Sequence, residues 1–188
     1  VGVPLKNIGI AVSCDAHEGN PADHIIDEVE KTPNTLIAMA THGRSGIGRW
    51  VMGSVTDKVL NGTTNPLLII HPRNEDAESS EVSLNNVIVP LDGSPLAEQI
   101  LPHVTAVAQA LGLNVILVRV TPSADEYYRF MDHSMAAAIN IDKYEDSAGE
   151  ADSEATRYLD RVKEKLIQDK VSSVGSRLLH GNAAKAIV

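Results

Sequence analysis

Leu36-Ile37-Ala38-Met39-Ala40 and the later run Leu67-Leu68-Ile69-Ile70 decide the fold class of this chain. Both runs are short and almost continuously apolar, which is typical of parallel strands that are buried on both faces. Strand-like runs of this kind occur at residues 8–13, 35–40, 67–70, 87–91, 114–120 and 174–179. Because stretches of helical period separate them, the sequence predicts an α/β fold, an open parallel sheet with helices on both faces.

Start and stop signals mark the helices between these runs. Asn20-Pro21 places a capping residue before a proline at the first helical position, and Ser94-Pro95 repeats this arrangement. Gly112 is expected to end the second of these helices. Farther along, an apolar stripe with three- and four-residue spacing predicts an amphipathic helix, and its members are Ala155, Tyr158, Leu159, Val162 and Leu166.

Composition excludes several classes of protein. The chain has 188 residues and a net charge of −9, without a block of basic residues, which argues against nucleic acid or an anionic membrane as its partner. No apolar run reaches the ~18 residues that a membrane span needs. The lone Cys14 excludes an internal disulfide and a cysteine-rich zinc site. We therefore expect a cytoplasmic protein with a substantial core.

A weak internal repeat indicates how the chain is organised. Residues 19–26 align with residues 181–188, with identities at Gly, Asn, Ala and Ile and an offset of 162 residues. The offset suggests that the repeat unit is one whole α/β domain. A polar, acidic stretch at 73–85 is typical of a linker. We expect a piece of a longer protein, with residues 1–72 ending one domain and residues 86–188 beginning the next.

The segment from Thr41 to Asp57 follows a buried strand and leads into a helix. Three glycines between residues 43 and 48 allow a tight turn and close approach of a ligand. Ser54 and Asp57 resemble a helix cap, so backbone N–H groups at this helix start would favour phosphate oxygens. The alternative is that the glycines only shape a connection. The segment matches neither the Walker A loop nor the Rossmann fingerprint.

These segments also resemble a known family. Three features look like the end of a universal stress protein domain. They are residues 39–46, the spacing of nine residues from Gly43 to Gly53-Ser54, and residues 65–70. Residues 87–94 look like the start of another domain. The resemblance implies a tandem universal stress protein with a Rossmann-like, five-stranded parallel sheet that binds an adenine nucleotide.

The resemblance also implies the residues of a nucleotide site. Phosphate binding would fall to Gly43, Gly53, Ser54, Val55 and Thr56, with Ala40 where the family pattern has its first glycine. Pro90 and Asp92 match positions that flank adenine and ribose, and Val120 matches one that binds adenine through its backbone. The first group precedes the linker and the second follows it. A composite site would therefore need a fold assembled in permuted order, or exchange between two chains.

The resemblance implies a regulatory module of the stress response that binds ATP, with or without Mg, and forms a homodimer. A second interpretation is a dimerising interaction scaffold of the same fold that has lost nucleotide binding, with Ala40 marking the lost site. The third is a slow ATPase. It ranks last because the sequence offers no convincing base or magnesium-binding acid near the glycine-rich segment. We predict no catalytic and no metal-binding residue.

Overall fold

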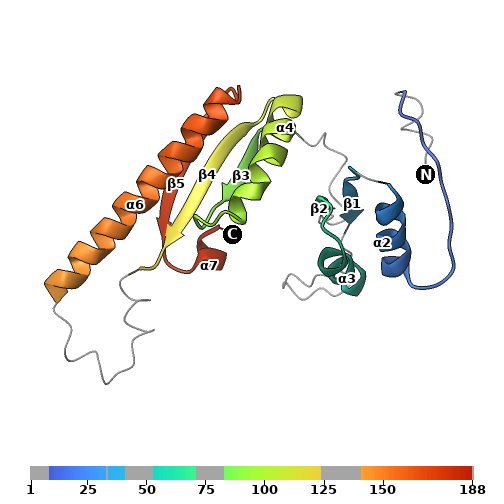
Figure 1. The fold of residues 1–188 in the computed structure, drawn as a ribbon, viewed down its shortest axis with the longest axis horizontal. Helices are drawn as coiled ribbons and strands as arrows, with labels where there is room; N and C mark the ends of the chain where they lie inside the picture. Colours follow the sequence, from blue (N-terminus) through green and yellow to red (C-terminus); the bar gives the residue numbers. More distant parts are fainter. Residues whose placement is uncertain (1–8, 33, 41–52, 71–82, 124–140, 188) are drawn as a thin grey trace, which may run out of the picture. The chain divides into compact units, whose positions relative to one another are not determined.

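A computed structural model describes residues 9–32, 34–40, 53–70, 83–123 and 141–187. The chain divides into two compact units, Val1–Ser80 and Glu81–Val188, each with its own sheet (Figure 1). All the described strands pair in parallel and helices connect them, so the predicted α/β class is confirmed. The strands form one two-stranded and one three-stranded sheet instead of the expected five-stranded sheet, because strands pair only within their own unit.

The first unit contains helix α2 (Pro21–Lys31), strand β1 (Ile37–Ala40), helix α3 (Ser54–Gly62) and strand β2 (Leu67–Ile70). The predicted start of α2 is confirmed, since Asn20 Oδ1 accepts a hydrogen bond from the Ala22 N–H at 3.0 Å. Both helices bury apolar side chains against the same strand, in a small core of Ala22, Val29, Ile37 and Val59.

The strand predicted at residues 8–13 is wrong over its described part. Residues 9–13 adopt no regular structure, and none of the described strands pairs with them. Ile10 is 49% exposed, and none of residues 9–13 is fully buried. A strand needs hydrogen bonds from a neighbouring strand, and apolar character alone does not supply them. Ile8 lies outside the described residues.

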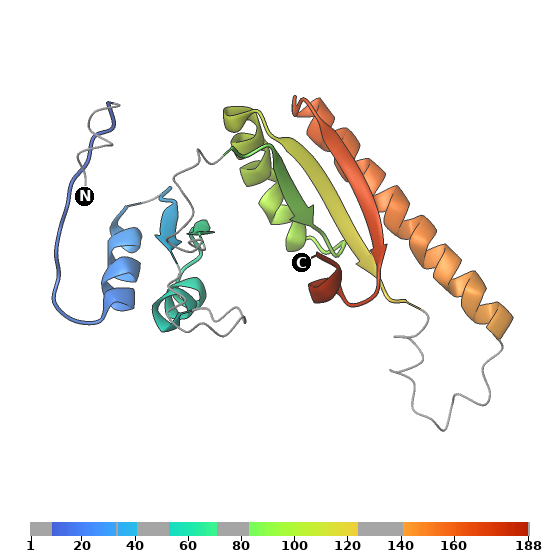
Figure 2. The same cartoon turned by 180° about the vertical axis from the view of Figure 1, so that it is seen from behind.

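The second unit contains the three-stranded sheet. Its order is β3-β4-β5, and the elements are β3 (Asn86–Pro90), η1 (Ala97–Ile100), α4 (Leu101–Leu111), β4 (Asn114–Thr121), α6 (Ile141–Gln168), β5 (Val174–His180) and α7 (Ala183–Ile187). Figure 2 shows the three strands side by side, with α6 running along β5. Gly112 ends α4 with φ +65°, as predicted.

Alternation along β4 separates the two faces of this sheet. Val115 and Leu117 point into a core that also contains buried residues of α4 and α6, so both helices cover this face. The predicted stripe of α6 is confirmed, because all of its members are buried. Val118 and Val120 point to the opposite face, where the short α7 lies near the carboxyl end of β4.

The two copies of the predicted repeat share their local geometry. Gly19 and Gly181 have φ values of +124° and +108°, which favour glycine because an L side chain would be strained there. An asparagine follows each glycine, and its side-chain Oδ1 accepts a hydrogen bond from a backbone N–H of the helix that begins there. The distances are 3.0 Å for Asn20 and 3.3 Å for Asn182. The similarity between the copies therefore extends from the sequence to the backbone.

Two neighbouring residues of α6 provide a test of this packing. Leu166 is 0% exposed and lies in the core, whereas Ile167 is 52% exposed. We expect Leu166→Ala to lower the free energy of unfolding of the second unit by about 2–5 kcal/mol, because it leaves a cavity. Ile167→Ala should change it by less than about 0.5 kcal/mol. Hydrogen exchange of the β4 amides measures both effects, and equal effects would contradict this packing.

Candidate functional site

A pocket lies where β3 and β4 end in the second unit. Its volume is about 280 Å³, and it is lined by Pro90, Leu91, Asp92, Ala97, Val118, Val120, Ala183 and Ile187. Open parallel sheets bind ligands at the carboxyl ends of their strands, which is where this pocket is found. The structure therefore brings together three residues that the sequence analysis selected, namely Pro90, Asp92 and Val120. Among the described residues that line the pocket, Asp92 is the only one with a charged side chain.

The backbone of Val120 is left without a strand partner on one side. The ladder between β3 and β4 ends at the pair Pro90 and Val118, where the Leu91 N–H donates to the Val118 carbonyl at 2.8 Å. Alternate residues of a strand direct their backbone groups to the same neighbour, so Val120 also faces the β3 side. Among the described residues, no backbone hydrogen bond joins Val120 to the residues after β3. Within the described ranges, its N–H and C=O thus have no backbone partner on the side where β3 ends.

A tight turn holds Asp92 at the mouth of the pocket. Asp92 Oδ1 accepts a hydrogen bond from the Ser94 N–H at 2.8 Å, and Ser94 Oγ accepts one from the Ala97 N–H at 3.1 Å. Gly93 between them has φ +89°. Hydrogen bonds from Ser94 lower the pKa of Asp92, and the positive charge of Arg119 adds to this effect. Asp92 is therefore an ionised hydrogen-bond acceptor at neutral pH.

The predicted phosphate-binding residues form a separate group in the first unit. Gly53 is the N-cap of α3, and no side chain caps this helix, so the prediction of a cap built from Ser54 and Asp57 is wrong. The Asp57 N–H instead bonds the Gly53 carbonyl at 2.9 Å, because the helix already begins at Ser54. Thr56 is only 3% exposed, so its side chain is buried.

The remaining members of that group differ in accessibility. Ser54 is exposed, Val55 is half-buried, and Ala40 is the exposed last residue of β1. The glycine-rich segment, including Gly43, lies outside the described residues.

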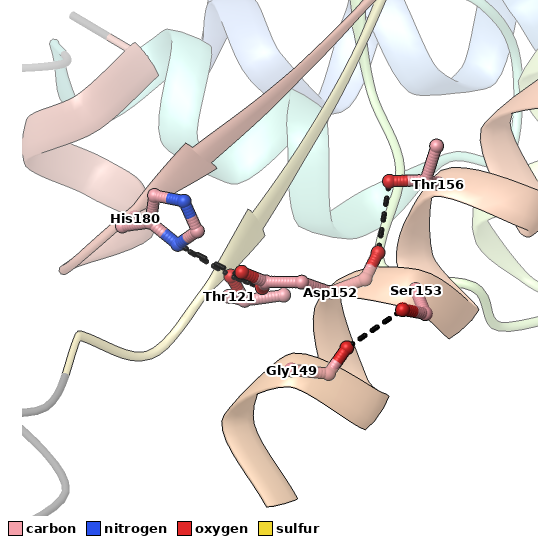
Figure 3. A network of polar contacts seen from close by, with 6 residues as sticks. All are labelled: Thr121, Gly149, Asp152, Ser153, Thr156 and His180. Carbon is pink, nitrogen blue, oxygen red and sulfur yellow. Dashed lines mark hydrogen bonds and ion pairs between the residues drawn. The ribbon is translucent and has the colours of Figure 1, made fainter. Parts of the chain in front are cut away.

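A polar cluster that was not predicted from the sequence lies at the ends of β4 and β5. The Thr121 hydroxyl lies 2.8 Å from Asp152 Oδ1 and 3.0 Å from His180 Nδ1, as Figure 3 shows. Asp152 Oδ1 and His180 Nδ1 are 3.8 Å apart. Thr121 and His180 are register partners and each ends its strand, which was the available signal. The cluster links α6 to the ends of both strands.

A second missed feature is the environment of Tyr158 on α6. Its side chain is 5% exposed, and its hydroxyl oxygen has no hydrogen-bond partner among the described residues. The guanidinium carbons of Arg119 and Arg161 lie 5.1 and 5.8 Å from the ring centroid. Burial, and then the negative charge of Glu98, raise the pKa of Tyr158 to about 12, so the phenol stays protonated.

Membrane spans and metal clusters are both absent from the part of the chain that the structure describes. No helix there is long and apolar enough to cross a membrane. Within the same described ranges, no group of three or more His, Cys, Asp or Glu side chains is arranged to hold a metal ion.

Comparison with curated proteins identifies relatives with consistent descriptions. Universal stress protein MJ0531 of Methanocaldococcus jannaschii is 34% identical over 62 residues, which are 33% of this chain and 36% of that protein. A universal stress protein of Mycolicibacterium smegmatis is 22% identical over 112 residues, 60% of this chain and 36% of that protein. Universal stress protein MJ0577 of M. jannaschii is 27% identical over 70 residues, 37% of this chain and 43% of that protein. The chain thus spans less than half the length of these relatives.

Solved structures and a family model complete the comparison. A universal stress protein family member from Burkholderia pseudomallei aligns with a TM-score of 0.42 and 19% identity, covering 56% of this chain and 71% of that one. UspA from Lactobacillus plantarum aligns with a TM-score of 0.38 and 14% identity, covering 54% and 63%. The model of the universal stress protein family matches residues 4–71 and 84–188, which is most of the sequence. This chain belongs to the universal stress protein family.

Proposed function

We propose that the second unit is an adenine-nucleotide-binding module that takes ATP and acts in the regulation of a stress response. The observation that carries the proposal is the free backbone of Val120 in a pocket that also contains Asp92. An apolar cavity with a few convergent polar groups is the usual form of a small-molecule site. Here the polar groups are one N–H, one C=O and one carboxylate.

The backbone of Val120 suits adenine better than guanine. An adjacent N–H and C=O complement adenine, whose edge presents the N1 acceptor beside the N6 amino donor. Guanine presents the O6 acceptor and the N1–H donor in the reverse order. A site that leaves a buried polar group unpaired with the wrong ligand discriminates strongly against it. We therefore propose that this site selects the adenine base.

Asp92 and the volume of the pocket suggest how the rest of the ligand is held. An ionised carboxylate accepts hydrogen bonds from ribose hydroxyls or from the adenine amino group. A volume of about 280 Å³ is small for a complete nucleotide and suits the nucleoside part. The phosphates, with or without Mg, would then extend beyond the pocket.

The predicted phosphate-binding residues fit a tandem arrangement. The family model matches the chain in two segments, 4–71 and 84–188. We propose that the first segment ends one domain and that the second begins the next. Gly43, Gly53 and Ser54 would then bind phosphate in the site of the first domain, and Asp92 would belong to the site of the second.

A dimerising interaction scaffold is the second candidate, and one observation favours it. Apolar side chains on α4, on η1 and on the residue that precedes η1 are exposed to solvent, namely Leu96, Ile100, Val107 and Leu111. Leu96 alone is 75% exposed. Exposed apolar stripes are typical of surfaces that bind proteins. We propose a cytoplasmic homodimer in either case, and nucleotide binding separates the two candidates.

The first test identifies any ligand that the protein retains. We expect denatured, purified protein to release ATP or ADP in near-stoichiometric amount, detected by chromatography and mass spectrometry. Added ATP at a hundred times its Kd should stabilise the ligand-free protein by about 2.7 kcal/mol and raise its Tm by several degrees. GTP at the same concentration should have little effect. A protein that is empty and unaffected by ATP would favour the scaffold.

The second test concerns Asp92. We expect Asp92→Ala to weaken ATP binding about tenfold, because it removes the acceptor at the pocket, which corresponds to about 1.4 kcal/mol. Asp160→Ala, on the exposed surface of α6, removes the same charge and should leave the Kd unchanged. Isothermal titration of both variants measures the difference. Equal Kd values for the two variants would contradict the role of Asp92.

A further inference from the structure

The turn that carries Asp92 rests against one side chain of β4. A Cβ atom placed on Gly93 would lie 3.2 to 3.3 Å from the Nη1, Cζ and Nη2 atoms of Arg119. The guanidinium of Arg119 therefore packs directly against the backbone of the turn, at a point where any other residue would crowd it. This close approach accounts for glycine at position 93 together with its φ of +89°.

The same guanidinium also contacts a ring on α6. Its Cζ atom lies 5.1 Å from the centroid of Tyr158, within the range of a cation–π interaction. Tyr158 is buried in the core between the sheet and α6, so the ring is fixed by its packing. Arg119 is thus held between a rigid aromatic ring and the turn. Its guanidinium thus contacts both neighbours at once, although the residue is only half-buried.

The positive charge of Arg119 also acts on Asp92. Arg119 is near enough to Asp92 to stabilise the ionised carboxylate electrostatically, in addition to the hydrogen bonds from Ser94. The Cζ atom of Arg161 lies 5.8 Å from the centroid of the same Tyr158 ring, whereas the three heavy atoms nearest to the Cβ position of Gly93 all belong to Arg119. Two arginines therefore share one ring, and only Arg119 joins the ring to the turn.

We infer that Arg119 is a positioning residue, which packs between Gly93 and Tyr158 and thereby holds the Asp92 carboxylate at the pocket. The group that Asp92 would bind, a hydrogen-bond donor of an adenine nucleoside, is taken from the proposed function, and in this respect the inference rests on that function. Arg119 itself contacts no ligand in this arrangement. It acts through Asp92, by fixing the turn and by favouring the ionised acceptor.

The test compares Arg119→Met with Arg161→Met in the full chain. Both variants remove one guanidinium from the same ring, and only the first removes the contact with the turn. Two measurements need no nucleotide. Carboxyl NMR, assigned through Asp92→Asn, should show that Arg119→Met raises the pKa of Asp92, and exchange of the Ser94 amide should quicken about tenfold as the turn loosens. Arg161→Met should change neither.

Nucleotide binding provides the third measurement. We expect Arg119→Met to weaken ATP binding about tenfold, while Arg161→Met changes it less than about twofold. The inference is overturned if Arg119→Met leaves the Asp92 titration and the Ser94 exchange unchanged, or if Arg161→Met reproduces its effects. The inference would also be overturned if Arg119→Met raised the pKa of Asp92 but left ATP binding unchanged. If the wild-type chain binds no ATP, the proposed function fails, and the two ligand-free measurements still decide whether Arg119 positions Asp92.

Discussion

The unequal lengths of two neighbouring strands determine the site in the second unit. Strand β3 ends at Pro90, which pairs with Val118 of β4. Strand β4 continues for three residues beyond Val118, to Thr121. Backbone groups that β3 would otherwise bind are thereby presented at the sheet edge. An unpaired N–H or C=O in a partly buried position is costly unless a ligand or water satisfies it. The end of β3 therefore produces both the pocket and its polarity.

Support for this edge comes from the face of the sheet that α6 covers. Residues on β4 alternate, so Arg119 points to α6 while its neighbours Val118 and Val120 line the pocket. The core around Leu117 and Tyr158 fixes β4 and α6 to each other. Rigid packing on one face thus provides the base on which the turn with Asp92 is held. The polar cluster of Thr121 adds a second link between α6 and the strand ends.

Much of this fold could be predicted from local patterns. Asn20, Gly112 and the α6 stripe act through contacts within a few residues or through one buried face, and sequence periodicity reports both. Residues 9–13, the described part of the run at 8–13, have the same apolar character but pair with none of the described strands, which a local pattern does not reveal. The cap of α3 was misplaced by one residue because Gly53 serves as N-cap without a side chain.

The site was only partly predictable, for a related reason. Pro90, Asp92 and Val120 stand in a recognisable family pattern, and they gather at one pocket. Arg119 and Tyr158 are 39 residues apart in the sequence, and their contact depends on the register of α6 against β4. Likewise, Thr121 and His180 meet only because two strands end together. Residues that support a site through tertiary packing leave no short motif.

The electrostatics of the chain restrict how a nucleotide can be recognised. With a net charge of −9 and a carboxylate at the pocket, the protein offers no long-range attraction for a polyanion. Under the proposed function, affinity for a nucleotide would come from short-range contacts, namely the Val120 backbone, the Asp92 acceptor and the apolar walls. Such contacts are hardly screened by salt and depend strongly on geometry. Under the proposed function, a carboxylate positioned by the half-buried Arg119 and the buried Tyr158 ring would therefore matter more for binding than the total charge of the surface.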